Sequence, residues 1–257
     1  MMKGQGKMKK VIINADDFGL TKGVSLGILD SMEKGVVTET TAMANGLYIK
    51  EAIEEAKVRG IKNIGVHLTL TWGKPILPRE EIKSIVSEEG NFHRRIDLVE
   101  NINYEEVKKE FKAQIEKIIS MGIVPTHLDG HHHAFAFTNE GLDVVFELAK
   151  EYNLPVRCPF IENLNYFKDN NIKTTDDMCI DFYNEGVTED YLIKVLENAK
   201  DGQVLEIMCH PAYVDEDLIN ATSYNKHRAE EFRVLTSEKI KTYINENNIE
   251  LIGFNEI

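Results

Sequence analysis

Residues 11–19 read VIINADDFG, so a short apolar run passes directly into two adjacent aspartates. The run 11–14 predicts a buried strand, because β-branched residues bounded by polar ones are typical of strands. Asp16 and Asp17 then fall where that strand gives way to a loop. Active sites of parallel α/β folds form at the carboxyl ends of strands, so this stretch predicts both a strand and a candidate site.

The succession of a strand and a helix recurs about seven times along the chain, which predicts a parallel sheet built from βα units. The expected strands are residues 11–14, 36–41, 64–70, 125–129, 155–157, 204–209 and 249–254, and the expected helices are residues 22–34, 49–59, 104–121, 139–152, 188–200, 223–235 and 237–247. Residues 71–103 are interpreted as a long functional loop with short helices, and residues 160–186 as irregular. No linker rich in proline, glycine or serine divides the chain, so we expect one domain spanning residues 1–257.

This pattern leaves two α/β architectures open, a (β/α) barrel and an open doubly wound sheet. The sequence contains no GxGxxG motif and no GxxxxGK[ST] phosphate loop, which weakens the nucleotide-binding version of the second.

The chain has 257 residues, 42% of them hydrophobic and 28% charged, which excludes a wholly disordered chain, a collagen and a coiled coil. A formal net charge of −13 argues against a general nucleic-acid binder and against a polybasic membrane anchor. No apolar stretch approaches the ~20 residues of a membrane span, and no signal peptide is recognisable. Three scattered cysteines fit a reducing compartment better than a disulfide framework. We therefore expect a cytoplasmic, soluble protein with no nucleic-acid or membrane partner.

Polar residues that can carry chemistry gather at the expected strand ends. They are Asp16, Asp17, His67, His127, Asp129, the triple 131–133 of histidines, Arg157 and His210. Six of the eight histidines fall in these segments, and only His93 and His227 do not. Each piece alone has an ordinary explanation, since adjacent aspartates are often cap residues and a strand histidine is often a hydrogen-bonded core residue. Their conjunction at one face of a parallel fold predicts a metal site.

A catalytic divalent ion typically takes three protein ligands and leaves room for water. One of the two adjacent aspartates suffices as a ligand, and the other is then available as a general base. Asp129 shares a strand face with His127, which makes it a candidate for fixing a histidine tautomer. Arg157 is a candidate for holding the base carboxylate ionised, and His210 for protonating a leaving amine.

Four motifs occur in an order that resembles one known family. They are NADDFGL at residues 14–20, GVHLTLT at 65–71, PTHLDGHHH at 125–133 and CHP at 209–211. On these motifs the chain resembles the YdjC-like carbohydrate deacetylases, which include chitooligosaccharide deacetylase. The likeness covers almost the whole chain, from about Lys10 to the last expected strand.

This resemblance implies an irregular, TIM-like (β/α) barrel with fewer than the regular eight units, in a protein usually found as a homodimer. It implies a divalent metal, generally Mg²⁺ in this family, held by Asp17, His67 and His131. Two imidazoles, however, favour Zn²⁺ or another transition ion. It further implies Asp16 as general base and His210 as acid in the removal of N-acetyl groups from small acetylated sugars such as chitooligosaccharides, with or without a phosphate.

The chain departs from the family at Phe135, where relatives often carry a further histidine, and at Gly130, where they often carry serine. Residues 160–186 match no family motif, so specificity stays open. Lys22 and Lys74 follow strand ends and are interpreted as solvated lysines, with contact to a sugar phosphate as the alternative. Three other readings of the site remain. One is another metal-dependent hydrolase, such as a phosphoesterase with a second metal ~3.5–4 Å from the first, and another is a non-catalytic metal- or sugar-binding protein. The third is a structural metal clamp, which would show full fourfold ligation with no open position.

Overall fold

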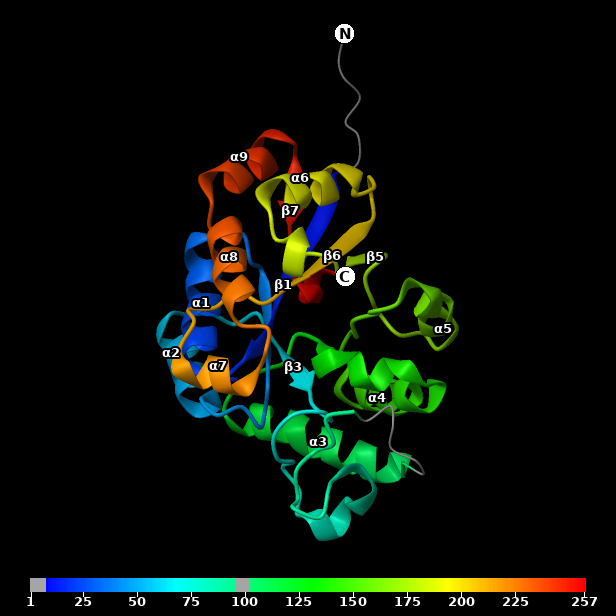
Figure 1. Ribbon diagram of the computed structural model, residues 1–257. Coiled ribbons are helices and arrows are strands. Elements are labelled where there is room, and N and C mark those ends of the chain that lie inside the picture. The colour runs from blue at the N-terminus through cyan, green and yellow to red at the C-terminus, as the bar shows by residue number, and fades with distance from the viewer. Residues whose placement is uncertain (1–7, 96–101) are drawn as a thin grey trace.

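A curled parallel sheet built on β1 (Lys9–Phe18) forms the centre of the fold (Figure 1). The computed structural model describes residues 8–95 and 102–257. Within these ranges the other strands are β2 (Glu39–Ala42), β3 (Ile64–Leu68), β4 (Leu128–Gly130), β5 (Asp177–Cys179), β6 (Val204–Cys209) and β7 (Ile249–Leu251). The strand order is β4-β3-β2-β1-β6-β5, β7 also pairs with β1, and all these pairings are parallel. The expected parallel α/β sheet is confirmed.

The strand β1 is long enough to carry three neighbours. Residues 10–15 pair with β6 along one edge of β1. Because that edge is occupied, β7 and β2 share the other, β7 beside residues 9–11 and β2 beside residues 14–18. The side chains of β1 are buried from Val11 onward, which explains why its sequence opens with an uninterrupted apolar run.

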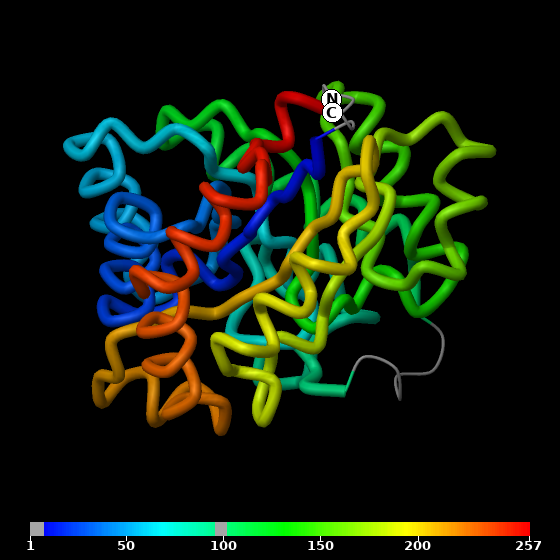
Figure 2. The backbone as a smooth tube through the Cα atoms, turned by 90° about the horizontal axis from the view of Figure 1, so that it is seen from above, coloured from blue at the N-terminus to red at the C-terminus, as the bar shows by residue number. Residues whose placement is uncertain are grey.

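Two irregular stretches complete the curl between β4 and β5. Leu128 of β4 forms a parallel bridge with Val156, whose N–H donates to the Lys173 carbonyl at 2.9 Å. The Asp176 N–H then donates to the Val204 carbonyl at the start of β6, also at 2.9 Å. Backbone hydrogen bonds therefore run all the way round, which confirms the irregular (β/α) barrel. Figure 2 shows β1 in blue beside β6 in gold at its centre.

Helices cover the outside of the curled sheet. In the described part of the chain they are α1 (Lys22–Lys34), α2 (Ile49–Val58), α3 (Tyr104–Ser120), α4 (Asn139–Tyr152), α5 (Leu164–Asp169), α6 (Glu189–Asn198), α7 (Glu216–Ala221), α8 (Lys226–Leu235) and α9 (Glu238–Glu246), together with short 3₁₀ turns. Figure 1 places α1, α2, α7 and α8 on one flank and α4 and α5 on the opposite one. None of the helices described is both long and apolar enough to cross a membrane.

The helix α1 shows how the sequence fixes this packing. The Thr21 hydroxyl caps the helix by accepting from the Val24 N–H at 3.3 Å. Gly27 lies so close to the chain after β6 that a Cβ there would come within 2.6 Å of the Ala212 Cα. A side chain at this position would push α1 away from the segment that follows β6, which is one wall of the candidate site described below.

The largest differences from the sequence-based expectation lie between residues 153 and 225. The stretch 160–186, expected to be irregular, contains α5 and β5, whose strand residues are only half-buried and form no apolar run. The strand expected at residues 155–157 is wrong in extent, because it makes a single bridge at Val156. The short helix α7 has no counterpart among the expected elements, and the helix expected from residue 223 begins at Lys226.

Glu39 is a buried carboxyl at the start of β2, on the side of the barrel where β7 lies. Its oxygens accept from the Phe254 N–H at 2.9 Å and from the Thr126 hydroxyl at 2.8 Å. Burial outweighs these hydrogen bonds and raises the pKa of Glu39 to about 7, from an ordinary value of 4.5. Because the folded state binds this proton more tightly than the unfolded chain, the contribution of Glu39 to stability falls as pH rises from 4.5 through about 7.

We therefore expect the free energy of unfolding of Glu39→Gln, relative to that of wild type, to be higher at pH 8 than at pH 5. This difference between the two proteins should increase across that window by up to about 3 kcal/mol. Urea denaturation of both proteins at each pH measures it, with the exposed Glu185→Gln as control. A difference between Glu39→Gln and wild type that does not change with pH would contradict the prediction.

Candidate active site

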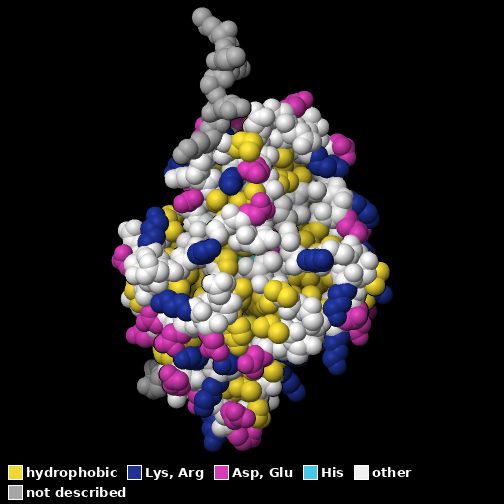
Figure 3. Space-filling model, turned by 180° about the vertical axis from the view of Figure 1, so that it is seen from behind, with side chains coloured by type: hydrophobic (Ala, Val, Ile, Leu, Met, Phe, Trp, Pro, Cys, Tyr) yellow, Lys and Arg dark blue, Asp and Glu magenta, His cyan; other side chains and the backbone are white. Residues whose placement is uncertain are grey.

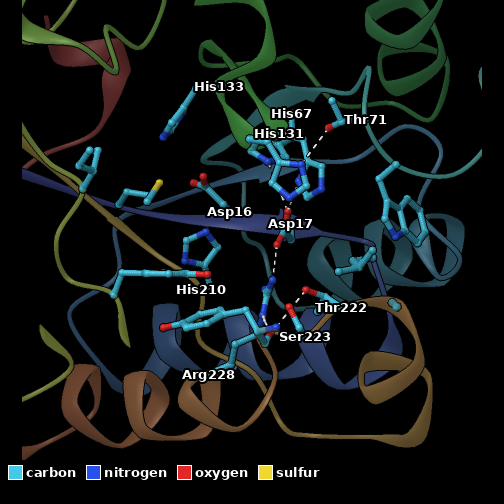
Figure 4. A pocket seen from close by; sticks show the side chains of 18 of the residues that line it. Asp16, Asp17, His67, Thr71, His131, His133, His210, Thr222, Ser223 and Arg228 are labelled. Carbon is cyan, nitrogen blue, oxygen red and sulfur yellow. Dashed lines mark hydrogen bonds and ion pairs between the residues drawn. The ribbon is translucent and has the colours of Figure 1, made fainter. Parts of the chain in front are cut away.

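The carboxyl ends of the strands open into a cavity of about 450 Å³. Side chains in its walls that can take part in chemistry are Asp16, Asp17, His67, His131, His132, His133, His210 and Arg228. They come from β1 and β3, from the segments that follow β4 and β6, and from α8. Figure 4 shows Asp17 between the imidazoles of His67 and His131 on one side and the guanidinium of Arg228 on the other. Segments far apart in the sequence thus meet at one end of the barrel, as the strand-end pattern predicts.

Three donor atoms converge at the centre of this cavity. The Asp17 Oδ1 lies 2.9 Å from His131 Nδ1 and 3.3 Å from His67 Nε2. Ligand atoms of all three residues lie within 4.8 Å of one another, and all three side chains are buried. Two imidazole nitrogens and one carboxylate oxygen form a donor set that fits a divalent cation with open coordination positions.

The backbone at Asp17 is turned to present this carboxylate. Its φ is 71°, a left-handed conformation that is uncommon for a residue other than glycine and is concentrated at functional sites. The second oxygen of Asp17 accepts from Arg228 Nη2 at 2.7 Å, and Arg228 Nε donates to the Tyr224 carbonyl. Burial raises the pKa of Asp17, but Arg228 and His131 outweigh it and hold that pKa well below its usual range. Asp17 is thus kept ionised, with one oxygen left for a cation.

The adjacent Asp16 has a different set of partners. Its two oxygens accept from Arg157 Nη1 and Nη2 at 2.7 and 2.8 Å, which is a bidentate pair. Although burial raises the pKa of Asp16, the Arg157 charge outweighs it, and the net pKa lies below its usual range. The same Arg157 donates from Nε to Glu206 at 2.6 Å and lies 3.0 Å from Asp129 Oδ2. A fully buried arginine therefore joins three carboxylates from three strands.

Asp129 fixes the tautomer of a histidine, as the sequence suggests, and that histidine is His67. The Asp129 Oδ1 lies 2.7 Å from His67 Nδ1, while its Oδ2 accepts from the Thr41 hydroxyl at 2.9 Å. This contact leaves His67 Nε2 facing Asp17. Burial lowers the pKa of His67, but the surrounding carboxylates raise it to about 10, which reflects an excess of negative charge that a cation would neutralise.

His210 lies at the end of β6, beside Asp16 in Figure 4. The backbone N–H of His210 donates to the carboxylate of Glu231, a buried residue of α8. The same carboxylate accepts from the Tyr224 hydroxyl. The Nδ1 of His210 lies 3.8 Å from Glu231 Oε1. Glu231 therefore holds the backbone of His210 in place and lies beside its imidazole.

Of the remaining histidines of the strand-end motifs, two line the cavity and one does not. His132 lines the cavity with its Nδ1 2.9 Å from the Thr71 hydroxyl, and His133 lines it too. Both have positive φ, 54° and 53°, so the turn after β4 is strained where it meets the site. His127 does not reach the cavity. It stacks on Phe254 at 3.7 Å inside the barrel, where burial lowers the pKa of His127 to about 3.

Four charged residues of this site are missing from the sequence-based set: Arg94, Glu206, Arg228 and Glu231. Glu206 carries a visible signal, because it interrupts the apolar run of β6. Arg228 and Glu231 stand three residues apart on α8 and are both buried, but in the sequence they are two of many charges on a polar helix. Arg94 also lines the cavity, whereas Lys22 and Lys74 do not.

Comparison with known proteins gives one consistent result. Residues 10–246 match the family model of the YdjC-like proteins. The "carbohydrate deacetylase" of Clostridium beijerinckii is 41% identical over 249 residues, which cover 96% of this chain and 100% of that protein.

Solved structures extend the comparison to the fold. A structure from Enterococcus faecalis V583, provisionally described as a cellobiose-phosphate cleavage protein, is 39% identical with a TM-score of 0.92, covering 97% of this chain and 98% of that one. A family 4 carbohydrate esterase from Streptomyces lividans is 10% identical with a TM-score of 0.50, covering 96% of this chain and 92% of that one. The latter likeness concerns the fold alone.

If the three converging donors bind a cation, removing one of them should release it. We expect His131→Ala to lose metal on dialysis and to bind a divalent ion at least about tenfold more weakly than wild type. The matched control is His132→Ala, which removes a neighbouring imidazole engaged by Thr71. Metal content by mass spectrometry measures both, and the reverse order of loss would contradict this ligand set.

Arg157 is expected to be essential for stability. Arg157→Met would leave Asp16, Asp129 and Glu206 buried without their shared cation, a change that typically costs 3–5 kcal/mol, taken as an order of magnitude. Arg233→Met, which removes an exposed arginine paired with Glu230, should cost less than about 1 kcal/mol. Urea denaturation compares the two variants, and equal losses would show that the buried cluster contributes no more than a surface pair.

Proposed function

This chain belongs to the YdjC-like family and is a carbohydrate deacetylase, and we propose that it hydrolyses the N-acetyl group of small acetylated sugars at the cavity described above. The observation that carries the proposal is that two neighbouring aspartates have different partners. Asp17 faces two imidazoles and Asp16 faces Arg157. One carboxylate is thus placed to hold a cation and the other to accept a proton, as hydrolysis of an amide requires.

The proposed roles follow from these contacts. Asp17, His67 and His131 would hold the divalent ion, which when bound polarises the acetamide carbonyl and lowers the pKa of water. Asp16 takes the proton from the attacking water, and Arg157 keeps this carboxylate oriented and ionised between turnovers. His210 donates a proton to the amine nitrogen as the carbon–nitrogen bond breaks, so that an amino sugar and acetate leave. Glu231 fixes the backbone of His210 by accepting from its backbone N–H.

We propose Mg²⁺ on the basis of family resemblance, with Zn²⁺ or another transition ion as the alternative that two imidazole ligands favour. A chitooligosaccharide is the proposed substrate, and the description of the Enterococcus faecalis relative supports including a phosphorylated disaccharide. A cytoplasmic homodimer remains our expectation for the protein as a whole.

A phosphoesterase with two metals is the nearest rival, and the buried cluster argues against it. A second group of possible ligands exists, made up of Asp16, His67 and Asp129. Both carboxylates of this group, however, already bind the guanidinium of Arg157, at 2.7 and 3.0 Å. The place of a second cation is therefore taken by a side chain of the protein.

Acetate release tests the proposal directly. Metal-stripped protein should release acetate from diacetylchitobiose, or from its phosphate, only when a divalent ion is restored. Asp16→Asn should retain the metal and lose activity by about 10²–10⁴-fold, because it removes the general base alone. Asp169→Asn, which changes an exposed aspartate of α5, serves as control.

The outcomes separate the candidate functions. No acetate from either sugar, with folded and metal-loaded protein, would overturn the proposed activity. Asp16→Asn protein with full activity would remove Asp16 from its role while leaving the deacetylase assignment in place.

A further inference from the structure

A second cavity adjoins the one that holds the proposed metal site. It has a volume of about 470 Å³, and the two cavities share Thr71, Trp72, Arg94 and Ala221 in their walls. The two cavities therefore lie side by side, with Trp72 and Arg94 at their boundary. The first contains Asp17, and the second reaches Asp217 and Asn220 of α7.

The second cavity has the composition of a sugar site. Asn91, Asp217 and Asn220 supply amide and carboxylate groups that can hydrogen-bond hydroxyls, and Trp72 supplies a large apolar face. Such a mixture suits a pyranose ring, which has hydroxyls around its edge and carbon–hydrogen bonds on its faces. Neither a purely apolar ligand nor an extended basic one would match both kinds of group.

Trp72 is held in place before any ligand arrives. The Asn45 side-chain amide donates to the Trp72 carbonyl at 2.8 Å and to the Lys74 carbonyl at 3.0 Å. Between them Gly73 has a φ of 70°, and its carbonyl accepts from the Phe92 N–H at 2.9 Å. The indole is half-buried and packs on the hydrophobic core. A platform clamped in this way loses little freedom when a ring stacks on it.

Arg94 supplies the cationic group in the shared wall. It is exposed, and among the described residues no hydrogen bond or ion pair engages its guanidinium. The chain has a net charge of −13, and its acidic and basic side chains are interspersed over the face in Figure 3. Arg94 lines both cavities, so it places a cationic group beside the sugar-like one. A guanidinium pairs well with phosphate oxygens.

We propose that the second cavity binds the second ring of a disaccharide, stacked on Trp72, and that Arg94 selects substrates with a negative charge on that ring. This inference rests on the proposed function for the first cavity, where the acetylated ring would lie. Trp72 and Arg94 are specificity-determining residues in this scheme, and they take no part in bond breaking.

The chain offers a direct probe, because Trp72 is its only tryptophan. Intrinsic fluorescence of metal-loaded Asp16→Asn protein is titrated with N-acetylglucosamine, diacetylchitobiose and phosphorylated diacetylchitobiose. We expect the two disaccharides to change the emission and the phosphorylated one to bind at least about tenfold more tightly, a difference of about 1.4 kcal/mol. N-acetylglucosamine should change the emission less than either disaccharide does, because it would occupy the first cavity alone, where Trp72 is only part of the wall.

Substitutions test each residue separately in the active enzyme. Trp72→Ala should lower kcat/KM for both disaccharides by about tenfold or more, mainly through KM, and leave N-acetylglucosamine within about twofold. Arg94→Met should reduce only the advantage of the phosphorylated sugar. The matched controls are Phe137→Ala, an exposed aromatic residue, and Lys74→Met, a nearby exposed cation. Neither side chain lines the two cavities.

The readouts distinguish failure of the subsite from failure of the proposed function. Fluorescence changes with disaccharides but without acetate release would support the subsite and overturn the activity. Acetate release with silent fluorescence and an unaffected Trp72→Ala variant would overturn the subsite alone. Equal losses for mono- and disaccharides in Trp72→Ala would also overturn it, because they indicate packing. No response to any of the three sugars would overturn the inference for this ligand class.

Discussion

One buried arginine holds the centre of this barrel together. Arg157 binds Asp16 of β1, Asp129 of β4 and Glu206 of β6, all within 3.0 Å and out of contact with water. Well-packed apolar residues often stabilise a protein core as much as a buried charge cluster or more, since desolvating charges is expensive. The role of this cluster is therefore better explained by the groups that it positions than by a gain in stability. It ties three strands of the barrel to one another and places a carboxylate at the floor of the cavity.

This cluster also separates the chemistry of two adjacent aspartates. Alternation along β1 sends neighbouring side chains to different surroundings, and the left-handed backbone at Asp17 increases the divergence. Asp16 is held by Arg157 from inside the barrel, while Asp17 is held by Arg228 from α8. Each arginine keeps its carboxylate ionised, but only Asp17 faces two imidazoles. A pair that looks equivalent in the sequence therefore consists of two groups with separate partners.

The sequence predicts the features that follow from local strand patterns. It does not predict features that depend on contacts between segments far apart in the chain. Periodicity and the position of polar residues at strand ends suffice for the parallel sheet and for the cavity that Asp16, Asp17, His67 and His210 share. They do not predict β5, whose three residues form a strand only because β6 offers them an edge. Nor do they predict that Arg228 reaches Asp17, because a buried charge on a helix looks like an exposed one until the helix is docked.

The two cavities differ in how they are built. The first takes most of its reactive groups from strand ends and from Arg228 of a packed helix, whereas the second is lined by loops and by α7. Strands fix geometry closely, while loops tolerate insertion and replacement at little cost to the fold. Under the proposed function, hydrolysis of the bond would depend on the barrel itself, and the choice of sugar would depend on segments that can change without disturbing Arg157 and its carboxylates.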